Sequence, residues 1–129
     1  MLKNKKFENE KAPIEMEKVR IHFLEHYRLK AEQIDGLFNA LRKTLLKCLK
    51  EADEALENVN MKLLHKSAHG IKGVLLNLGR DDLAEQARQI ELSAKSEKDI
   101  LPDNVSKIQT LYQNKFNSLK DLIKPFISR

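Results

Sequence analysis

The feature that most constrains the fold is an unbroken apolar stripe with the period of an α-helix. Its apolar residues follow one another in alternating steps of four and three, with lysine and glutamate between them: Ile34, Phe38, Leu41, Leu45, Cys48, Ala52, Ala55 and Val59. This spacing places all of them on one face of a helix of about seven turns. The pattern predicts one long helix over residues 31–58, whose apolar face other helices must cover.

Other segments carry shorter stripes of the same period, and they predict further helices over 14–30, 61–78, 82–94 and 103–126. The inward face of the first is expected to hold Met16, Val19, Phe23, Leu24 and Tyr27. Residues typical of helix ends mark the boundaries: Pro13, Asn60, Gly79, Asp81 or Asp82, and Pro102 with Asp103. The polar stretch 93–99 is interpreted as a loop. Because the connections are short, neighbouring helices should run antiparallel.

Composition supports an all-α fold and one domain. The 129 residues include only 4 glycines, 3 prolines, 5% aromatic residues and no tryptophan, which disfavours a β-sandwich. The single cysteine, Cys48, cannot form an internal disulfide and is expected in the core. We therefore predict an antiparallel up-down four-helix bundle with an additional N-terminal helix. Residues 1–12 would form a polar lead, and 13–129 the bundle.

Charge and hydropathy exclude some classes of protein. No apolar run approaches the roughly 18 residues of a membrane span, and no signal-peptide pattern precedes the first helix. A cytoplasmic protein without a membrane partner is the simplest expectation. The net charge of +5 is too small to indicate nucleic acid, and no aromatic interleaving or helix-turn-helix pattern accompanies it.

The segment 61–78 has an unusual polar face. When its apolar stripe faces the core, the opposite side presents residues at spacings of three and four: His65, His69, Lys72, Gly73 and Leu76. Its two glycines, Gly70 and Gly73, each cost about 1 kcal/mol relative to alanine in a helix interior. Gly73 shares the face of His69, which favours the close approach of a large partner to the backbone there. The simpler interpretation of both glycines is a weak helix or a packing notch for a neighbouring helix. Gly70 lies to the side, and the sequence does not explain it.

The same region carries charge of one sign. Residues 58–80 contain Lys62, Lys66, Lys72 and Arg80 but no aspartate or glutamate. A solvated helix usually mixes signs, so this segment indicates an acidic or phosphorylated partner.

The run from Ala68 to Gly79 resembles the histidine-containing phosphotransfer (HPt) domain of two-component multistep phosphorelays. The family pattern is filled by His69, Ile71, Lys72, Gly73, Leu78 and Gly79, and it continues with Leu83, Ala87, Ile90 and Glu91. Family members usually carry small residues after the Lys-Gly pair, whereas this chain has Val74, Leu75 and Leu76. Of these three, Leu76 lies on the exposed face and could reshape the docking of a partner.

The resemblance implies a function and a site. His69 would accept a phosphoryl group from a phospho-aspartate of a response-regulator receiver domain and pass it to a second receiver. Lys72 would offset the phosphoryl charge, Gly73 would allow close approach, and Glu91 would hydrogen-bond the other imidazole nitrogen. The surface that contacts the partner would include His65, Lys66, Leu76 and Arg80, although His65 could instead act on its neighbour His69.

The same resemblance implies receiver domains and a hybrid sensor kinase as partners, with Mg²⁺ supplied by the receiver and no cofactor or metal held by this chain. No phosphate-binding loop is present, so ATP-dependent self-phosphorylation is not expected. The protein would be a phosphocarrier, and whether it counts as an enzyme is left open. Since the chain begins with Met1 and has 129 residues, a free-standing carrier is the simplest expectation.

Two other classes of function stay open. The four histidines form two pairs at i and i+4, His22 with His26 and His65 with His69, and this spacing can place two imidazoles on one metal ion. The bundle could also bind a partner without any phosphotransfer.

Overall fold

The computed structural model describes residues 14–97 and 99–127, and all of the regular secondary structure in these residues is helical. An N-terminal helix over 14–22 continues as the π-helical turn η1 (Phe23–Tyr27). It is followed by α2 (Ala31–Glu57), α3 (Met61–Asn77), α4 (Asp81–Ser96), the short 3₁₀ turn η2 (Pro102–Asn104) and α5 (Val105–Ile127). The predicted lead, residues 1–12, and Pro13 lie outside the described residues.

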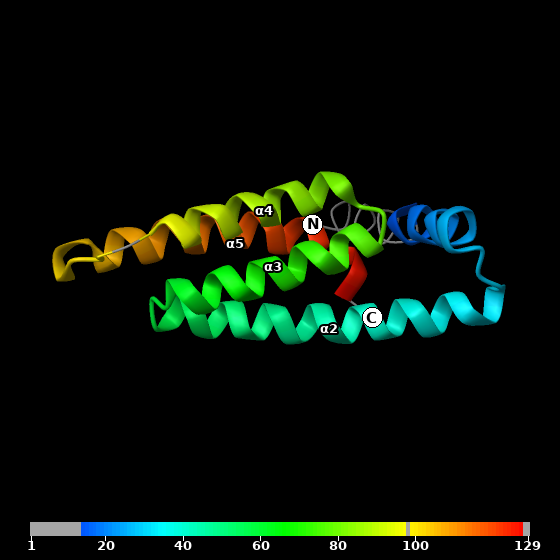
Figure 1. The fold of residues 1–129 in the computed structure, drawn as a ribbon, viewed down its shortest axis with the longest axis horizontal. Coiled ribbons are helices and arrows are strands. Elements are labelled where there is room, and N and C mark those ends of the chain that lie inside the picture. The colour runs from blue at the N-terminus through cyan, green and yellow to red at the C-terminus, as the bar shows by residue number, and fades with distance from the viewer. Residues whose placement is uncertain (1–13, 98, 128–129) are drawn as a thin grey trace, which may run out of the picture.

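The long helices form the predicted four-helix bundle, with the N-terminal helix added to it (Figure 1). Side-chain contacts between α2 and α5 show that this pair is antiparallel. Arg42, early in α2, reaches the carbonyl of Ile127 at the end of α5, and Asp53, late in α2, pairs with Lys120. The fold class predicted from the sequence is confirmed.

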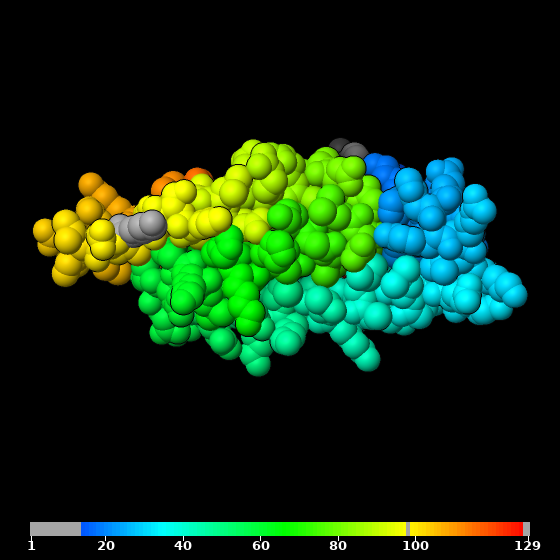
Figure 2. Space-filling view, viewed as in Figure 1, coloured from blue at the N-terminus to red at the C-terminus, as the bar shows by residue number. Residues whose placement is uncertain are grey.

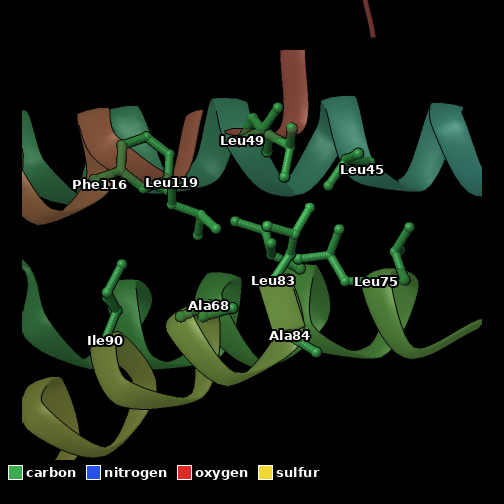
Figure 3. Packing of buried hydrophobic residues seen from close by; sticks show 14 of the residues in the cluster. Leu45, Leu49, Ala68, Leu75, Leu83, Ala84, Ile90, Phe116 and Leu119 are labelled. Atoms are coloured by element: carbon green, nitrogen blue, oxygen red, sulfur yellow. The ribbon is translucent and has the colours of Figure 1, made fainter. Parts of the chain in front are cut away.

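All four long helices contribute to one core. Figure 3 shows Leu45 and Leu49 of α2 facing side chains of the other helices. The core residues labelled there on α3, α4 and α5 are Ala68, Leu75, Leu83, Ala84, Ile90, Phe116 and Leu119, and all are buried. Within α2 the buried face differs from the predicted stripe. Leu49 and Leu56, which the stripe did not include, are buried, whereas Leu41 and Cys48, which it did include, are only half-buried.

Both ends of α3 are fixed as the sequence predicts. The side chain of Asn60 accepts a hydrogen bond from the backbone N–H of Leu63 at 3.1 Å, which caps the first turn. At the other end Gly79 has φ 76°, and the N–H groups of Gly79 and Arg80 donate to the carbonyls of Leu76 and Leu75. This is a Schellman motif, which needs a left-handed residue at the position of Gly79.

One predicted helix boundary and one predicted buried face were wrong. The stretch 93–99 is not all loop, since α4 continues to Ser96 and buries Ala94. In the N-terminal helix Val19 and Phe23 are buried as expected, but Leu24 and Tyr27 are exposed. The last turn there is π-helical, and Tyr27 is its final residue, with its ring centroid 5.8 Å from that of Phe23.

The N-terminal helix lies beside the first half of α2, beyond the end of α3 (Figure 1). Val19 lines a shallow groove together with Ile34 and Phe38 of α2. Its contacts with the α3–α4 end of the bundle include the ring of His22 against Gly79 and two polar contacts. Glu15 pairs with Arg80, and the hydroxyl of Tyr27 donates to the carbonyl of Asn77 at 3.3 Å. Within the described residues, no helix is long and apolar enough to cross a membrane.

Candidate functional site

His69 lies near the middle of α3 with 67% of its side chain exposed. The helix buries Leu64, Ala68, Ile71 and Leu75, and this apolar face turns position 69 toward solvent. Figure 2 shows α3 (green) reaching the surface between α2 (cyan) and α4 (yellow-green). The structure therefore presents this imidazole on an open surface of the bundle.

A buried carboxylate from the neighbouring helix holds the imidazole of His69. Glu91 comes from α4, and only 8% of its side chain is exposed. Its Oε2 lies 2.6 Å from Nδ1 of His69, and its Oε1 lies 2.8 Å from Nζ of Lys72. The hydrogen bond between His69 and Glu91 that the family resemblance implied is present.

The charge state of Glu91 fixes the proton on the imidazole. Burial by itself would raise the pKa of Glu91, but the contacts with Lys72 and His69 outweigh burial and hold that pKa below its ordinary value. Glu91 is therefore ionised at neutral pH and can only accept hydrogen bonds. Nδ1 of His69 must carry the proton, so the lone pair of the neutral ring lies on Nε2, the nitrogen that does not contact Glu91.

Lys72 lies one turn after His69, and 23% of its side chain is exposed. Its ammonium group is paired with Glu91 rather than standing alone. The structure thus gathers one cation, one buried anion and one imidazole at the seam between α3 and α4, all within hydrogen-bond distance of Glu91. A buried carboxylate paired on both oxygens is held in one position.

The two glycines of α3 have different surroundings. A Cβ placed at Gly73 would meet no atom within 4 Å, so the surface beside His69 is open at that position. A Cβ at Gly70 would lie 2.6 Å from Sγ of Cys48, which is too close for two such atoms. Gly70, which the sequence did not explain, is therefore a packing notch for α2, and Cys48 fills that notch.

His65 is half-buried, and its Nδ1 lies 3.0 Å from the main-chain carbonyl of Glu91. A carbonyl oxygen only accepts, so Nδ1 of His65 is the donor. The sequence predicted His65 at the surface that contacts a partner. The structure instead turns this nitrogen toward α4.

Comparison with protein families adds an independent observation. A family model described as "Hpt domain" matches residues 36–121, which is more than half of the chain. The chain belongs to the Hpt domain family. Searches of curated proteins and of solved structures returned no match.

Membership places the chain in two-component signalling and gives it histidine phosphotransfer as its general chemistry, with response regulators and kinases as the general class of partner. The matched region begins within α2 and ends within α5, so it covers the bundle and leaves the N-terminal helix outside. The residues around His69 all lie within the match.

The remaining residues that the sequence assigned to partner contact fall into two groups in the Hpt domain. Lys66 and Leu76 are exposed on α3, one and two turns from His69, and 46% of Leu76 is accessible. Arg80 does not join them, since only 13% of its side chain is exposed. Its guanidinium pairs with Glu15 and Asp82 and stacks over a ring of α5, so it ties helices together.

Sequence reasoning missed the position of Tyr27. It was expected in the core, but its exposed ring lies at the end of α3, and its hydroxyl bonds Asn77, the residue after Leu76. No signal in the sequence indicates the π-helical turn in which Tyr27 lies. The exposed face of the Hpt domain near His69 is therefore bordered by the N-terminal helix.

The structure does not support the metal hypothesis for the histidine pairs. The centroids of the His22 and His26 rings lie 4.3 Å apart, with the ring planes tilted by 38°. Among the residues that the structure describes, no three histidine, cysteine, aspartate or glutamate side chains group closely enough to hold an ion.

Proposed function

We propose that this Hpt domain relays a phosphoryl group between the phospho-aspartates of response-regulator receiver domains, using Nε2 of His69. The observation that carries the proposal is the hydrogen bond between Nδ1 of the exposed imidazole and the buried, ionised carboxylate of Glu91. It leaves Nε2 with its lone pair and fixes the orientation of the ring.

The transfer step balances as a simple exchange of bonds. The lone pair of Nε2 attacks phosphorus, the P–N bond forms, and the P–O bond to the aspartyl carboxylate of the receiver breaks. The carboxylate leaves with the electron pair. Because Nδ1 keeps its proton, the ring becomes positively charged as the bond forms, and the adjacent carboxylate of Glu91 stabilises that charge.

The other residues act through charge and space. Phosphoryl transfer depends mainly on positioning and on neutralising charge. The ammonium of Lys72 lies one turn from His69 and can also face the phosphoryl oxygens, since it has three protons to donate. The open surface at Gly73 and the exposed side chains of Lys66 and Leu76 are where we expect a receiver domain to dock.

The donors and acceptors we propose are receiver domains, including one attached to a hybrid sensor kinase. We expect the Mg²⁺ that assists the reaction to come with the receiver, and this chain to act as a phosphocarrier without ATP-dependent kinase activity. Transfer back from phosphorylated His69 to a second receiver is the same bond exchange in reverse.

The test is transfer from a receiver domain phosphorylated on its aspartate. The wild-type protein should be labelled, with the acid lability of a phosphohistidine, and His69→Gln should not be labelled although it stays folded. His26→Gln is the matched control, because it removes another exposed histidine outside α3. Normal labelling of His69→Gln would refute the assignment. A folded wild-type protein that no receiver labels would favour a binding module without phosphotransfer.

A further inference from the structure

Three side chains from successive turns of α3 contact one residue of α4. His69 and Lys72 contact the two carboxylate oxygens of Glu91. His65, one turn earlier, contacts its main-chain carbonyl oxygen at 3.0 Å. Glu91 is thus held at its backbone and at both ends of its carboxylate by the same face of α3.

We propose that His65 is a positioning residue for phosphotransfer, which anchors the backbone of Glu91 to α3 so that the carboxylate meets Nδ1 of His69. The proposal rests on the proposed function of His69. It assigns His65 a role inside the site, in place of the contact with a partner that its position on the helix had indicated.

A main-chain anchor adds what the carboxylate contacts alone do not provide. The side chain of glutamate has three rotatable bonds, so its carboxylate could follow the imidazole while α4 slides along α3. The bond from His65 fixes the backbone at the root of that side chain. A carbonyl oxygen has two lone pairs, so it accepts from His65 in addition to its bond within the helix.

Burial and hydrogen bonding both argue against a role for Nδ1 of His65 in the docking of a receiver domain. The ring of His65 is half-buried between the two helices, and Nδ1 already has its partner. A receiver that contacts the exposed residues of α3 would meet His69 and Lys66 before it reached Nδ1 of His65. The effect of His65 should therefore be independent of the partner.

The first experiment uses phosphoramidate, a small phosphoryl donor that needs no docking surface. His65→Leu should slow phosphorylation of His69 about tenfold, since a misplaced supporting group commonly costs 10- to 100-fold. His65→Asn should stay within about twofold of wild type, because its amide nitrogen can replace Nδ1 as donor. Lys62→Leu is the control, a similar change at an exposed position of α3.

A second measurement reads the tautomer directly. In ¹⁵N NMR spectra the neutral ring of His69 should carry its proton on Nδ1 in the wild type and in His65→Asn. In His65→Leu the form protonated on Nε2 should become detectable. This measurement involves no phosphoryl group, so it tests the anchor even if receivers fail to label His69. An unchanged tautomer in a folded His65→Leu protein would overturn the proposal.

The decisive comparison is a double-mutant cycle with Glu91→Ala, which removes every side-chain acceptor at this position, scored with phosphoramidate. If His65 acts through Glu91, then His65→Leu should have little further effect once position 91 offers no acceptor to Nδ1 of His69. Equal losses in both backgrounds, or a loss seen only with a receiver as donor, would show that His65 acts elsewhere. Because His65→Asn retains the donor, an equal loss in that variant would also contradict the anchor.

Discussion

The two glycines of α3 allow a matched test of helix packing. Gly70 and Gly73 are three residues apart in the interior of one helix, so replacing either with alanine should gain the same helix propensity, about 1 kcal/mol. They differ in what the added methyl group meets. At Gly73 it meets nothing within 4 Å, whereas at Gly70 it meets Sγ of Cys48.

The magnitude follows from that contact. The 2.6 Å separation is about 0.8 Å short of the 3.4 Å at which ordinary van der Waals contact begins. The Cys48 side chain is short and half-buried, so its sulfur can move away only if α2 shifts or the side chain changes rotamer. Overpacking of this kind costs about 1–3 kcal/mol. Gly73→Ala should therefore stabilise the protein by about 1 kcal/mol, and Gly70→Ala should be neutral or destabilising by up to about 2 kcal/mol.

Urea denaturation measures both variants, and the propensity gain cancels in their difference. That difference should be about 1–3 kcal/mol. Repeating the pair in a Cys48→Ala background removes the sulfur, so the difference should shrink toward zero. If Gly70→Ala stabilised the wild-type protein as much as Gly73→Ala, the notch described for Gly70 would be refuted. Gly73→Ala should also slow phosphotransfer from a receiver, while phosphorylation by phosphoramidate stays normal.

Two further predictions concern the charges beside His69. The contacts of Glu91 hold its pKa below the ordinary 4.5, so its ionised form stabilises the fold above that pH, and this stability is lost as the pH falls below it. Glu91→Gln should therefore lower the free energy of unfolding by about 1–3 kcal/mol at pH 7. Between about pH 5 and 3 the variant should lose less stability than the wild type. If urea denaturation showed the same loss in both proteins over this pH range, the prediction would be wrong. Lys72→Ala should slow transfer from a receiver roughly tenfold, with Lys62→Ala as control, because one charge facing the phosphoryl oxygens is lost. Unchanged transfer rates would rule out that role.

The helices and their ends could be predicted because they depend on local signals. The helical period and the capping residues can be recognised within short stretches of sequence. The cap at Asn60 and the left-handed Gly79 were found where expected. The placement of Glu91 beside His69 came from a family resemblance rather than from local pattern. Its contact spans 22 residues between two helices, and no periodicity within either helix encodes it.

The errors have equally physical causes. The period of 3.6 assumes a helix that continues regularly, so it does not show that the N-terminal helix ends in a π-helical turn with Tyr27 exposed at its last position. The fit of Gly70 against Cys48 depends on the register between α2 and α3, which the tertiary packing sets. Arg80 was assigned to the surface that contacts a partner. Its burial follows in part from the N-terminal helix, whose Glu15 pairs with it through a contact that no sequence pattern indicates.

The positive charges of residues 58–80 are partly neutralised in the folded protein. Lys72 is balanced by Glu91 of α4, and Arg80 by Glu15 and Asp82, so half of the positive charge that indicated an acidic partner is neutralised inside the molecule. Lys62 and Lys66 are left, both exposed and without an ion pair to any other described residue. At physiological ionic strength exposed charges act over roughly 8 Å, so these two lysines can favour acidic groups only near the N-terminal half of α3. On the other side of His69 the surface offers Gly73 and Leu76, where a partner must match shape and apolar surface instead.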